Sequence, residues 1–282
     1  MRVLMCPPQY FDVPIEDKAR NPWMSVRQKP DPAVAFQQWQ KLLDFYAFHK
    51  LGMWFLRAQE GLFDQVFTAN IAWHKGNRAV IARLAPEWRR PEEKIVRDWF
   101  VREKYQVLDL PEDIFFEGQG DVLSIGDSGY LFCYGIRNNL EAMEFLERNL
   151  NLGGKFIPLK LVNPQFYHGD VCIRYSRHRN ALLYNPLAFD SESLRRIEQL
   201  PLKKMAAPKE MWVQETPKGR NFPLNGCYVD RIETFPWDLS LGPFPAKVRT
   251  WIQEDGGEIW ISNYDQFGLS GAGHRCCSYF LD

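Results

Sequence analysis

Hydrophobic and polar positions along the chain predict short strands interleaved with amphipathic helices. The clearest helix follows Asp31-Pro32, an N-cap residue and a first-turn proline, after which apolar residues recur at helical spacing until Gly52. Acidic residues directly after Pro91 favour a second helix because they suit the positive end of the helix dipole. Further helices are expected over Leu140–Leu150, from Asp190 to near Leu200, and over Ala246–Ile252.

The remaining apolar runs predict strands, several of which pair as hairpins around turn residues. The expected hairpins join Ile71–Trp73 to Ala79–Ile81, Asp121–Ile125 to Tyr130–Tyr134, and Val171–Tyr175 to Ala181–Tyr184. Single strands are expected at residues 2–5, Met53–Leu56, Lys155–Val162, Met211–Gln214, Glu258–Ser262 and the C-terminus. A hairpin followed by a helix recurs about every 55 residues, which indicates internal pseudo-repeats.

The domain organisation follows from what the chain lacks between these elements. No linker rich in glycine or serine and no low-complexity block divides it. Residues 201–225, rich in lysine and proline, look the least ordered, but the stretch is too short to mark a domain boundary. We therefore expect one mixed α/β domain over residues 1–282.

Composition and charge exclude some classes of function. Of 282 residues, 45% are hydrophobic and 25% charged, ordinary values for a globular enzyme with a sizeable core. The net charge is zero, from 35 basic and 35 acidic residues, which argues against a nucleic-acid partner. No apolar run approaches the roughly 20 residues needed to span a bilayer, and the first residues lack the pattern of a secretory signal. We therefore expect a cytoplasmic protein with no membrane partner; its oligomeric state stays open, a homo-oligomer included.

The six cysteines are expected to be free thiols in such a compartment. Cys6, Cys133 and Cys172 sit among apolar neighbours and read as buried structural residues. No pair has the two-residue spacing of a zinc knuckle, so a metal site is not expected. Cys276 and Cys277 differ because His274-Arg275 precede them, and nearby positive charge lowers a thiol pKa towards the working pH. In a strand the two would point to opposite faces, so only one faces a given site.

A nucleophilic cysteine needs a histidine that the fold brings close. His168, followed by Gly169 and Asp170, is the best candidate; in a strand, His168 and Asp170 would share a face. Glu117 and Asp121 flank a glycine-rich turn that enters a strand and permits close approach of a ligand. Taken singly, each of these segments also fits a purely structural role.

Together the segments resemble one known family. Phe67-Thr-Ala-Asn70, Phe116-Glu-Gly-Gln-Gly-Asp121, Tyr167-His-Gly-Asp170 and His274-Arg-Cys-Cys-Ser278 occur in the order found in the guanidine-modifying superfamily, and Asn21-Pro-Trp-Met24 near the start adds to the match. That superfamily includes arginine deiminases, dimethylarginine dimethylaminohydrolases and amidinotransferases. The resemblance covers nearly the whole chain and implies the pentein fold, a five-bladed α/β propeller with pseudo-fivefold symmetry and a central active site.

The resemblance also implies roles for individual residues. Cys276 matches the nucleophile, His168 the general acid and base, and Asp170 the carboxylate that grips two guanidinium nitrogens. Glu117 matches the acid that helps to hold the substrate and the histidine, with Asp121 as the alternative. Arg89 or Arg90 lies near the position of the arginine that clamps the α-carboxylate, and Asn21 is a further substrate-binding candidate. The partner is then a small guanidino substrate, and no metal or organic cofactor is required.

Asn70 points to one branch of this superfamily. Arginine deiminases have aspartate there, whereas Phe67–Asn70 together with Asn21–Met24 resembles the arginine dihydrolases, which convert arginine to ornithine, ammonia and carbon dioxide through a covalent cysteine intermediate. An amide both donates and accepts hydrogen bonds, so it can hold a guanidinium first and a ureido oxygen later. A deiminase or dimethylarginine hydrolase acting once, an amidinotransferase and a non-catalytic arginine-binding protein on the same scaffold remain alternatives.

Overall fold

The computed structural model describes residues 1–281, and one structural unit recurs through them. In this unit two strands form an antiparallel hairpin, a helix follows, and the chain returns in a strand parallel to the second strand. The first complete example is β3 (Ala72–Lys75), β4 (Arg78–Ile81), α2 (Pro91–Arg102) and β5 (Gln106–Leu108).

Three further units repeat this order of elements. They consist of β6 (Val122–Ser124), β7 (Tyr130–Tyr134), α3 (Leu140–Asn149) and β8 (Phe156–Lys160); of β9 (Ile173–Ser176), β10 (Ala181–Tyr184), α4 (Ser191–Gln199) and β11 (Lys203–Ala206); and of β14 (Tyr228–Val229), β15 (Ile232–Pro236), α5 (Ala246–Gln253) and β16 (Glu258–Ser262). The prediction of internal repeats, made from hairpin-plus-helix spacing, is therefore confirmed.

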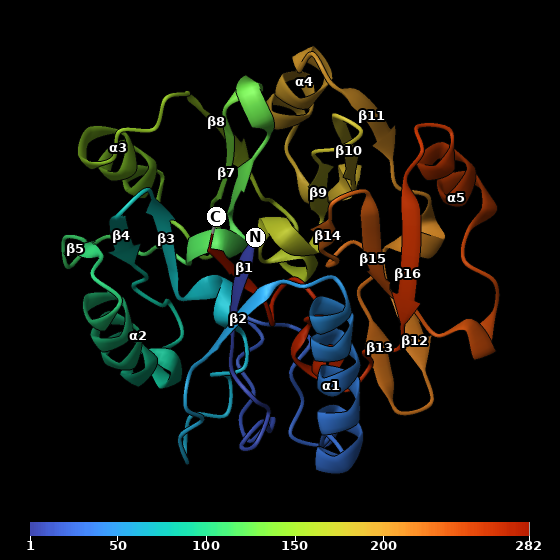
Figure 1. The fold of residues 1–282 in the computed structure, drawn as a ribbon, viewed down its shortest axis with the longest axis horizontal. Coiled ribbons are helices and arrows are strands. Elements are labelled where there is room, and N and C mark those ends of the chain that lie inside the picture. The colour runs from blue at the N-terminus through green and yellow to red at the C-terminus, as the bar shows by residue number, and fades with distance from the viewer. Residues whose placement is uncertain (282) are drawn as a thin grey trace.

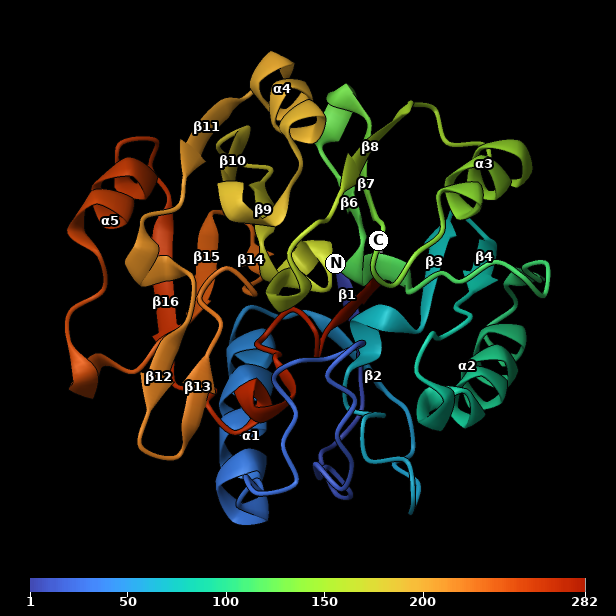
Figure 2. The same ribbon diagram turned by 180° about the vertical axis from the view of Figure 1, so that it is seen from behind.

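The two ends of the chain build the fifth sheet together. β17 (Tyr279–Leu281) pairs antiparallel with β1 (Arg2–Met5), and β1 pairs parallel with β2 (Gly52–Phe55) after α1 (Pro32–Phe48). The N- and C-terminal ends thus lie side by side at the centre, and the sheets follow one another around them in chain order (Figure 1). The view from behind shows the same ring, with the helices on its outside (Figure 2).

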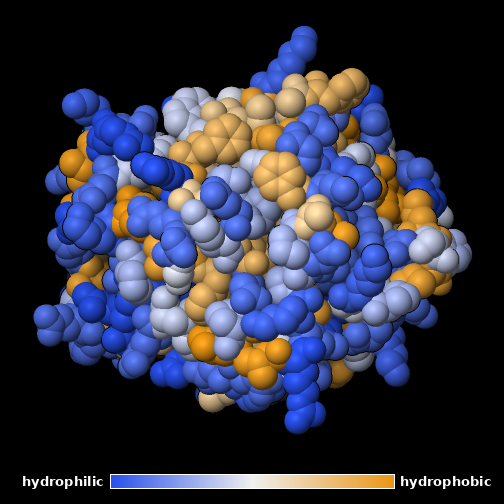
Figure 3. Space-filling model, turned by 90° about the horizontal axis from the view of Figure 1, so that it is seen from below, coloured by the Kyte–Doolittle hydropathy of each residue, from blue (hydrophilic) through white to orange (hydrophobic). Residues whose placement is uncertain are grey.

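Local chemistry explains why these elements form where they do. The Asp31 carboxylate accepts hydrogen bonds from the backbone N–H groups of Ala33 and Val34, which caps α1 as predicted. The face of α1 that carries Trp39 and Leu42 is buried in the largest apolar cluster, which joins all of the units except the one containing α2. Hydrophilic side chains dominate the lower surface, and apolar ones occur there in small separate groups (Figure 3).

Residues 201–225 depart from expectation. The strand predicted at Met211–Gln214 is wrong: Lys209–Met211 forms a 3₁₀ turn, and the strand β12 begins only at Gln214. β12 (Gln214–Thr216) and β13 (Gly219–Asn221) make a separate hairpin, so this lysine- and proline-rich stretch is folded. Short strands with a polar face carry too few apolar residues for a period-two signal.

Within residues 1–281, no helix combines the length and apolar character that a membrane crossing requires.

Candidate active site

Three of the four sequence segments occupy the same place in three successive units. Each forms a 3₁₀ turn just before the first strand of its sheet: Thr68–Asn70 before β3, Gly118–Gly120 before β6 and Gly169–Val171 before β9. The turns pack against one another at the centre of the ring. Equivalent positions in the repeat therefore bring residues that are some fifty positions apart into one site.

The middle turn depends on glycine for this close packing. Gly118 has a positive φ of 60°, and a Cβ there would lie 2.3 Å from the carbonyl oxygen of Ala72. A Cβ at Gly120 would lie 2.6 Å from Nδ2 of Asn70. Glycine at these two positions thus permits the close approach of β3 and of the turn that precedes it.

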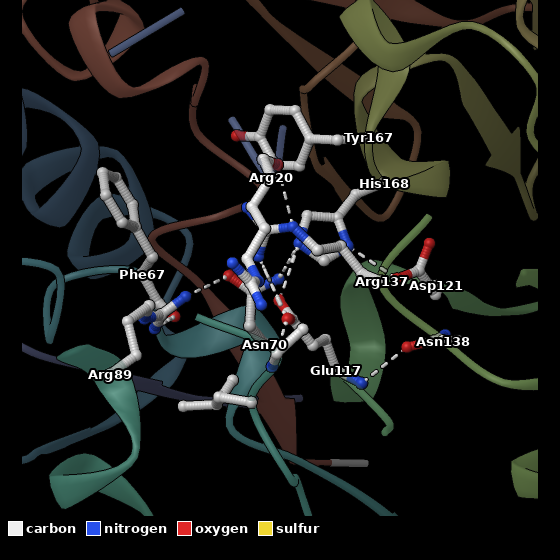
Figure 4. A network of polar contacts seen from close by, with 12 residues as sticks. Arg20, Phe67, Asn70, Arg89, Glu117, Asp121, Arg137, Asn138, Tyr167 and His168 are labelled. Atoms are coloured by element: carbon white, nitrogen blue, oxygen red, sulfur yellow. Dashed lines mark hydrogen bonds and ion pairs between the residues drawn. The ribbon is translucent and has the colours of Figure 1, made fainter. Parts of the chain in front are cut away.

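His168 lies between two carboxylates. Its Nδ1 is 2.6 Å from Asp121 and its Nε2 is 3.0 Å from Glu117, and all three side chains are buried (Figure 4). Burial alone would lower the pKa of His168, but Asp121 and Glu117 outweigh it and raise the pKa to about 9. The imidazole is therefore protonated at neutral pH and ready to act as an acid. Glu117 and Asp121, left as alternatives by the sequence, both contact the histidine.

His168 and Asp170 do not lie in a strand, the case in which they would share a face. His168 has extended backbone just before the 3₁₀ turn and Asp170 lies inside the turn, so the argument from a shared strand face does not apply. The packing of the turns, rather than the period of a strand, brings both residues to the same place.

Glu117 is held ionised by a residue that the sequence analysis missed. Arg137 donates to both Glu117 oxygens, at 3.0 and 2.9 Å, from the segment just after β7. Burial opposes the Glu117 charge, but Arg137 and His168 outweigh it and keep the pKa of Glu117 well below its usual range. Nothing in the sequence marks Arg137 except its place at the end of a strand.

Cys276 lies beside Asp170. Its Sγ is 3.5 and 3.8 Å from the two Asp170 oxygens, and 2% of the residue is exposed. Burial raises the pKa of the thiol well above its usual value, and Asp170 adds to that rise. Burial likewise raises the pKa of Asp170, to about 6, against the opposing charges of His168 and Arg275. Cys276 is therefore a thiol that donates its proton towards the Asp170 carboxylate.

The prediction that His274 and Arg275 activate the thiol is wrong. His274 is buried between Ser262 and Thr234, and burial lowers its pKa to about 3, so it carries no charge at neutral pH. The Arg275 guanidinium points away, towards Gln119 and the carbonyl of Ser278. All six cysteines are free thiols, as expected, and buried.

Asn70 connects this centre to Arg89. Arg89 donates to Oδ1 of Asn70 at 3.1 Å, while Nδ2 of Asn70 lies 3.4 Å from Nε2 of His168 (Figure 4). Arg89 is buried and also forms an ion pair with Glu92 at 2.8 Å. Arg90 is exposed and lies over the ring of Phe115, away from the site. Between the two arginines left open by the sequence, the structure brings Arg89 to the centre.

A narrow cavity joins these groups. Its wall contains Cys276, His168, Asn70, Asn21, Asp64, Phe67, Pro86, Trp88, Arg89, Arg137, Tyr167, Ser270 and Ala272. Asn21 helps to close the wall by donating to the carbonyl of Ser270 at 2.9 Å. Both Cys276 and Cys277 pack in the largest apolar cluster, but of the two only Cys276 is among the described residues that line this cavity.

Asp64 is a second residue missed from the sequence. It is buried; Trp88 donates to its Oδ2 at 2.9 Å, and its Oδ1 has no hydrogen-bond partner among residues 1–281. A buried carboxylate oxygen without a partner is costly unless a ligand supplies a donor. Asp64 lies only six residues before Asn70, outside the segment Phe67–Asn70 on which the resemblance rests.

Asp170, although it lies beside Cys276, is not among the described residues that line the narrow cavity; it borders a larger one, of about 720 Å³. Neither Cys276 nor His168 is among the described residues that line it. We take the smaller cavity as the candidate active site because it holds the reactive groups.

Comparison with known proteins places the chain in a family. The chain is 35% identical over 234 residues to AgrE of Nostoc, a bifunctional arginine dihydrolase/ornithine cyclodeaminase; the match covers 82% of this chain and 32% of AgrE. It is 33% identical over 282 residues to ArgZ of Synechocystis, of the same description, covering 98% and 37% of the two chains. A dimethylarginine dimethylaminohydrolase of Mycobacterium tuberculosis is 31% identical over 199 residues, covering 71% and 63%. The chain belongs to the guanidine-modifying superfamily.

The structures agree with this membership. The solved N-terminal domain of ArgZ, bound to product, has a TM-score of 0.86 and 28% identity to this chain, covering 99% and 96% of the two. The mixed α/β fold is thus the pentein fold of the superfamily, and the resemblance seen in the four segments is confirmed. No protein-family model matches the chain. The chain spans about a third of the length of its cyanobacterial relatives AgrE and ArgZ.

Proposed function

We propose that this protein is an arginine dihydrolase, which converts arginine and two water molecules to ornithine, carbon dioxide and two ammonia molecules. The observation that carries the proposal is Asn70, a buried amide in the wall of the cavity that also holds Cys276 and His168. Two relatives of the chain, AgrE and ArgZ, are named as bifunctional arginine dihydrolase/ornithine cyclodeaminases, which supports the proposed activity.

The cavity suits both ends of an amino acid with a guanidinium side chain. Arg89 and Arg137 offer positive charge to an α-carboxylate, and the unpartnered Oδ1 of Asp64 offers an acceptor to an α-ammonium. At the reacting end, Asp170 accepts from the guanidinium nitrogens, and Asn70 accepts through Oδ1 once Arg89 turns to the substrate. This double recognition holds the guanidinium carbon in line with Sγ of Cys276.

Substrate binding would itself activate the thiol. The raised pKa of Cys276 reflects burial and the Asp170 charge. A guanidinium held between Asp170 and Cys276 brings positive charge to Sγ and favours the thiolate. The enzyme then holds a reactive thiolate only when its substrate is present.

The first hydrolysis uses Cys276 and His168. The thiolate attacks the guanidinium carbon, and protonated His168 gives its proton to the departing ammonia, which leaves a covalent amidino-thioether. Neutral His168 then takes a proton from water, whose oxygen attacks the same carbon. Collapse of that adduct expels the thiolate and yields the ureido product, citrulline.

The second hydrolysis repeats these steps on the ureido carbon. Nδ2 of Asn70 donates to the ureido oxygen, which an aspartate would repel. Cys276 attacks, ammonia leaves with the proton of His168, and water releases a carbamate that decomposes to ornithine and carbon dioxide. Each step uses side chains alone, so no metal or organic cofactor takes part.

The architecture extends the proposal to the whole chain. The five units would be the blades of a propeller with pseudo-fivefold symmetry, because each repeats the same strand order, and residues 1–282 would form a single catalytic domain.

Six free cysteines are typical of a reducing compartment, which favours the cytoplasm.

Trapping of the covalent intermediate tests the proposal. Arginine is mixed with the protein, the reaction is stopped in acid, and the protein mass is measured. We expect an adduct of arginine less one ammonia on the peptide that contains Cys276. The Cys276→Ser variant should form no adduct and turn over no arginine, whereas Cys277→Ser should retain both. Turnover by Cys276→Ser, or loss of the adduct in Cys277→Ser alone, contradicts the assignment.

A further inference from the structure

Asn225 is a buried side chain that connects both sides of the reacting centre. Its Nδ2 donates to the backbone carbonyl of Asp170 at 3.0 Å. Its Oδ1 accepts from the backbone N–H of Gly273 at 2.8 Å and from that of Cys276 at 3.1 Å. Its own carbonyl accepts from the N–H of Arg275 at 3.1 Å. No part of Asn225 is exposed.

The place of Asn225 in the repeat matches that of the site residues. Asn70, Asp121 and Asp170 each lie within three residues of the first strand of their units, and Asn225 lies three residues before β14, the first strand of the fourth unit. Each of these four units thus supplies a buried polar side chain to the centre from the segment that leads into its first strand. The first three contact Cys276, His168 or both; Asn225 contacts the backbone of Cys276.

From these contacts we propose that Asn225 is a positioning residue, which sets the distance between Cys276 and Asp170 and stabilises the thiolate of Cys276. The proposal rests on the function proposed above, because it gives Cys276 the part of nucleophile. One amide holds the nucleophile loop and the Asp170 turn together, so movement of Asn225 shifts Sγ relative to the carboxylate that orients the guanidinium. Such a shift of about 1 Å can cost about 10²-fold in rate.

The nucleophile loop is built around this amide. A Cβ at Gly273 would lie 2.8 Å from the Asn225 carbonyl oxygen and 3.1 Å from Oδ1, so only glycine allows the loop to close so tightly. Hydrogen bonds from Asn225 and from the Gly273 backbone also hold the pKa of Cys276 below the value that burial and Asp170 would otherwise give. The close packing of the loop and the pKa of the thiol both support a role for Asn225 in positioning Cys276.

Alkylation of Cys276 by iodoacetamide measures this role without substrate. The rate is followed against pH by mass spectrometry of the peptide, with fragmentation to separate Cys276 from Cys277, in wild type, Asn225→Asp and Asn225→Ser. Aspartate keeps the acceptor oxygen but loses the donor Nδ2 and adds a negative charge, whereas serine is uncharged and too short to bridge. Asn221→Ser is the matched control, because Asn221 is also fully buried but bonds to Gln214, Asn263 and Tyr264.

We expect the pH midpoint of alkylation to rise by about one unit in Asn225→Asp and to rise in Asn225→Ser, with no change in Asn221→Ser. With arginine as substrate, kcat should fall about tenfold or more in both Asn225 variants, and KM should change less. Folded Asn225 variants that alkylate as wild type does overturn the proposal, as does loss of folding in both, which would make Asn225 a residue of the fold alone. A shifted midpoint in a protein whose wild type leaves arginine unchanged supports the role of Asn225 and contradicts the proposed function.

Discussion

At the scale of single residues, the centre rests on the balance of charge around His168. Two buried carboxylates, those of Glu117 and Asp121, face the imidazole of His168. Arg137 forms an ion pair with Glu117, so Glu117 stays ionised while it contacts the histidine. The raised pKa of His168, about 9, makes the imidazolium the resting state. A proton donor is thus in place before ammonia has to leave.

Glu117→Gln tests this balance. Removal of the Glu117 charge lowers the pKa of His168, because a smaller negative field then opposes burial. We expect the alkaline limb of the kcat profile, set by loss of the acid form near pH 9, to move to lower pH and kcat to fall. The exposed Glu112 provides the control Glu112→Gln, whose profile should match wild type. An unchanged alkaline limb in Glu117→Gln would mean that another group sets it.

Asn70→Asp tests the amide. A carboxylate still holds the guanidinium, so the first hydrolysis should continue, but it cannot donate to the ureido oxygen. We expect citrulline to accumulate and ornithine to fall at least about tenfold, an effect of the size that loss of one donor to a developing charge produces. Chromatography of the products gives the ratio directly. If the variant makes only ornithine, at the wild-type rate, the amide has no such role.

At the scale of elements, the site depends on turns that precede strands rather than on the strands themselves. Thr68–Asn70, Gly118–Gly120 and Gly169–Val171 pack closely enough for a carboxylate on one to reach a histidine beside another. The middle turn is the most constrained, since Gly118 combines a positive φ with a Cβ position only 2.3 Å from a carbonyl oxygen.

Gly118→Ala should displace that turn. Both the positive φ and the collision with Ala72 oppose a side chain, so we expect the free energy of unfolding to fall by more than about 1 kcal/mol and turnover to be lost. Gly153→Ala is the matched control: Gly153 has a φ of 64°, but a Cβ there would meet nothing within 4 Å. Its variant should lose a little stability and keep its activity. Equal stability losses in the two variants, measured by denaturant unfolding, would contradict a role for close packing.

Sequence patterns predicted the elements with a strong period and missed those without one. The cap at Asp31 and the spacing of Trp39 and Leu42 identified α1, whereas β5, β11, β14 and β15 went unpredicted, as did the β12–β13 hairpin apart from a misplaced strand. At the site, Cys276, His168, Glu117 and Asn70 were found because they carry recognisable chemistry in a recognisable order. Arg137, Asp64 and Asn225 were not, because each gains its role from a tertiary contact, with Glu117, Trp88 and Cys276 respectively, that no local sequence pattern reveals.

At the scale of the whole molecule, the buried histidine links stability to pH. The pKa of His168 in the folded protein is about 9, against about 6.5 in an unfolded chain, so folding strengthens proton binding. Its contribution, about 3 kcal/mol, is fully present below pH 6.5 and is lost as pH rises from 6.5 to about 9.

The pH dependence of unfolding tests this linkage. We expect the free energy of unfolding of wild type to decline between pH 6.5 and 9, and His168→Gln to show a flatter dependence over the same range. Denaturant unfolding at several pH values supplies both curves. Parallel curves for the two proteins would show that His168 titrates alike in the folded and unfolded states.

If one cavity hydrolyses the same carbon of arginine twice, that carbon ends as carbon dioxide. Arginine labelled with ¹³C at the guanidinium carbon is incubated with the wild-type protein, and products are followed by NMR together with released ammonia. We expect the label to appear in carbon dioxide and bicarbonate, with one ornithine and two ammonia molecules per arginine consumed. Label that stays in citrulline, with one ammonia per arginine, would contradict it.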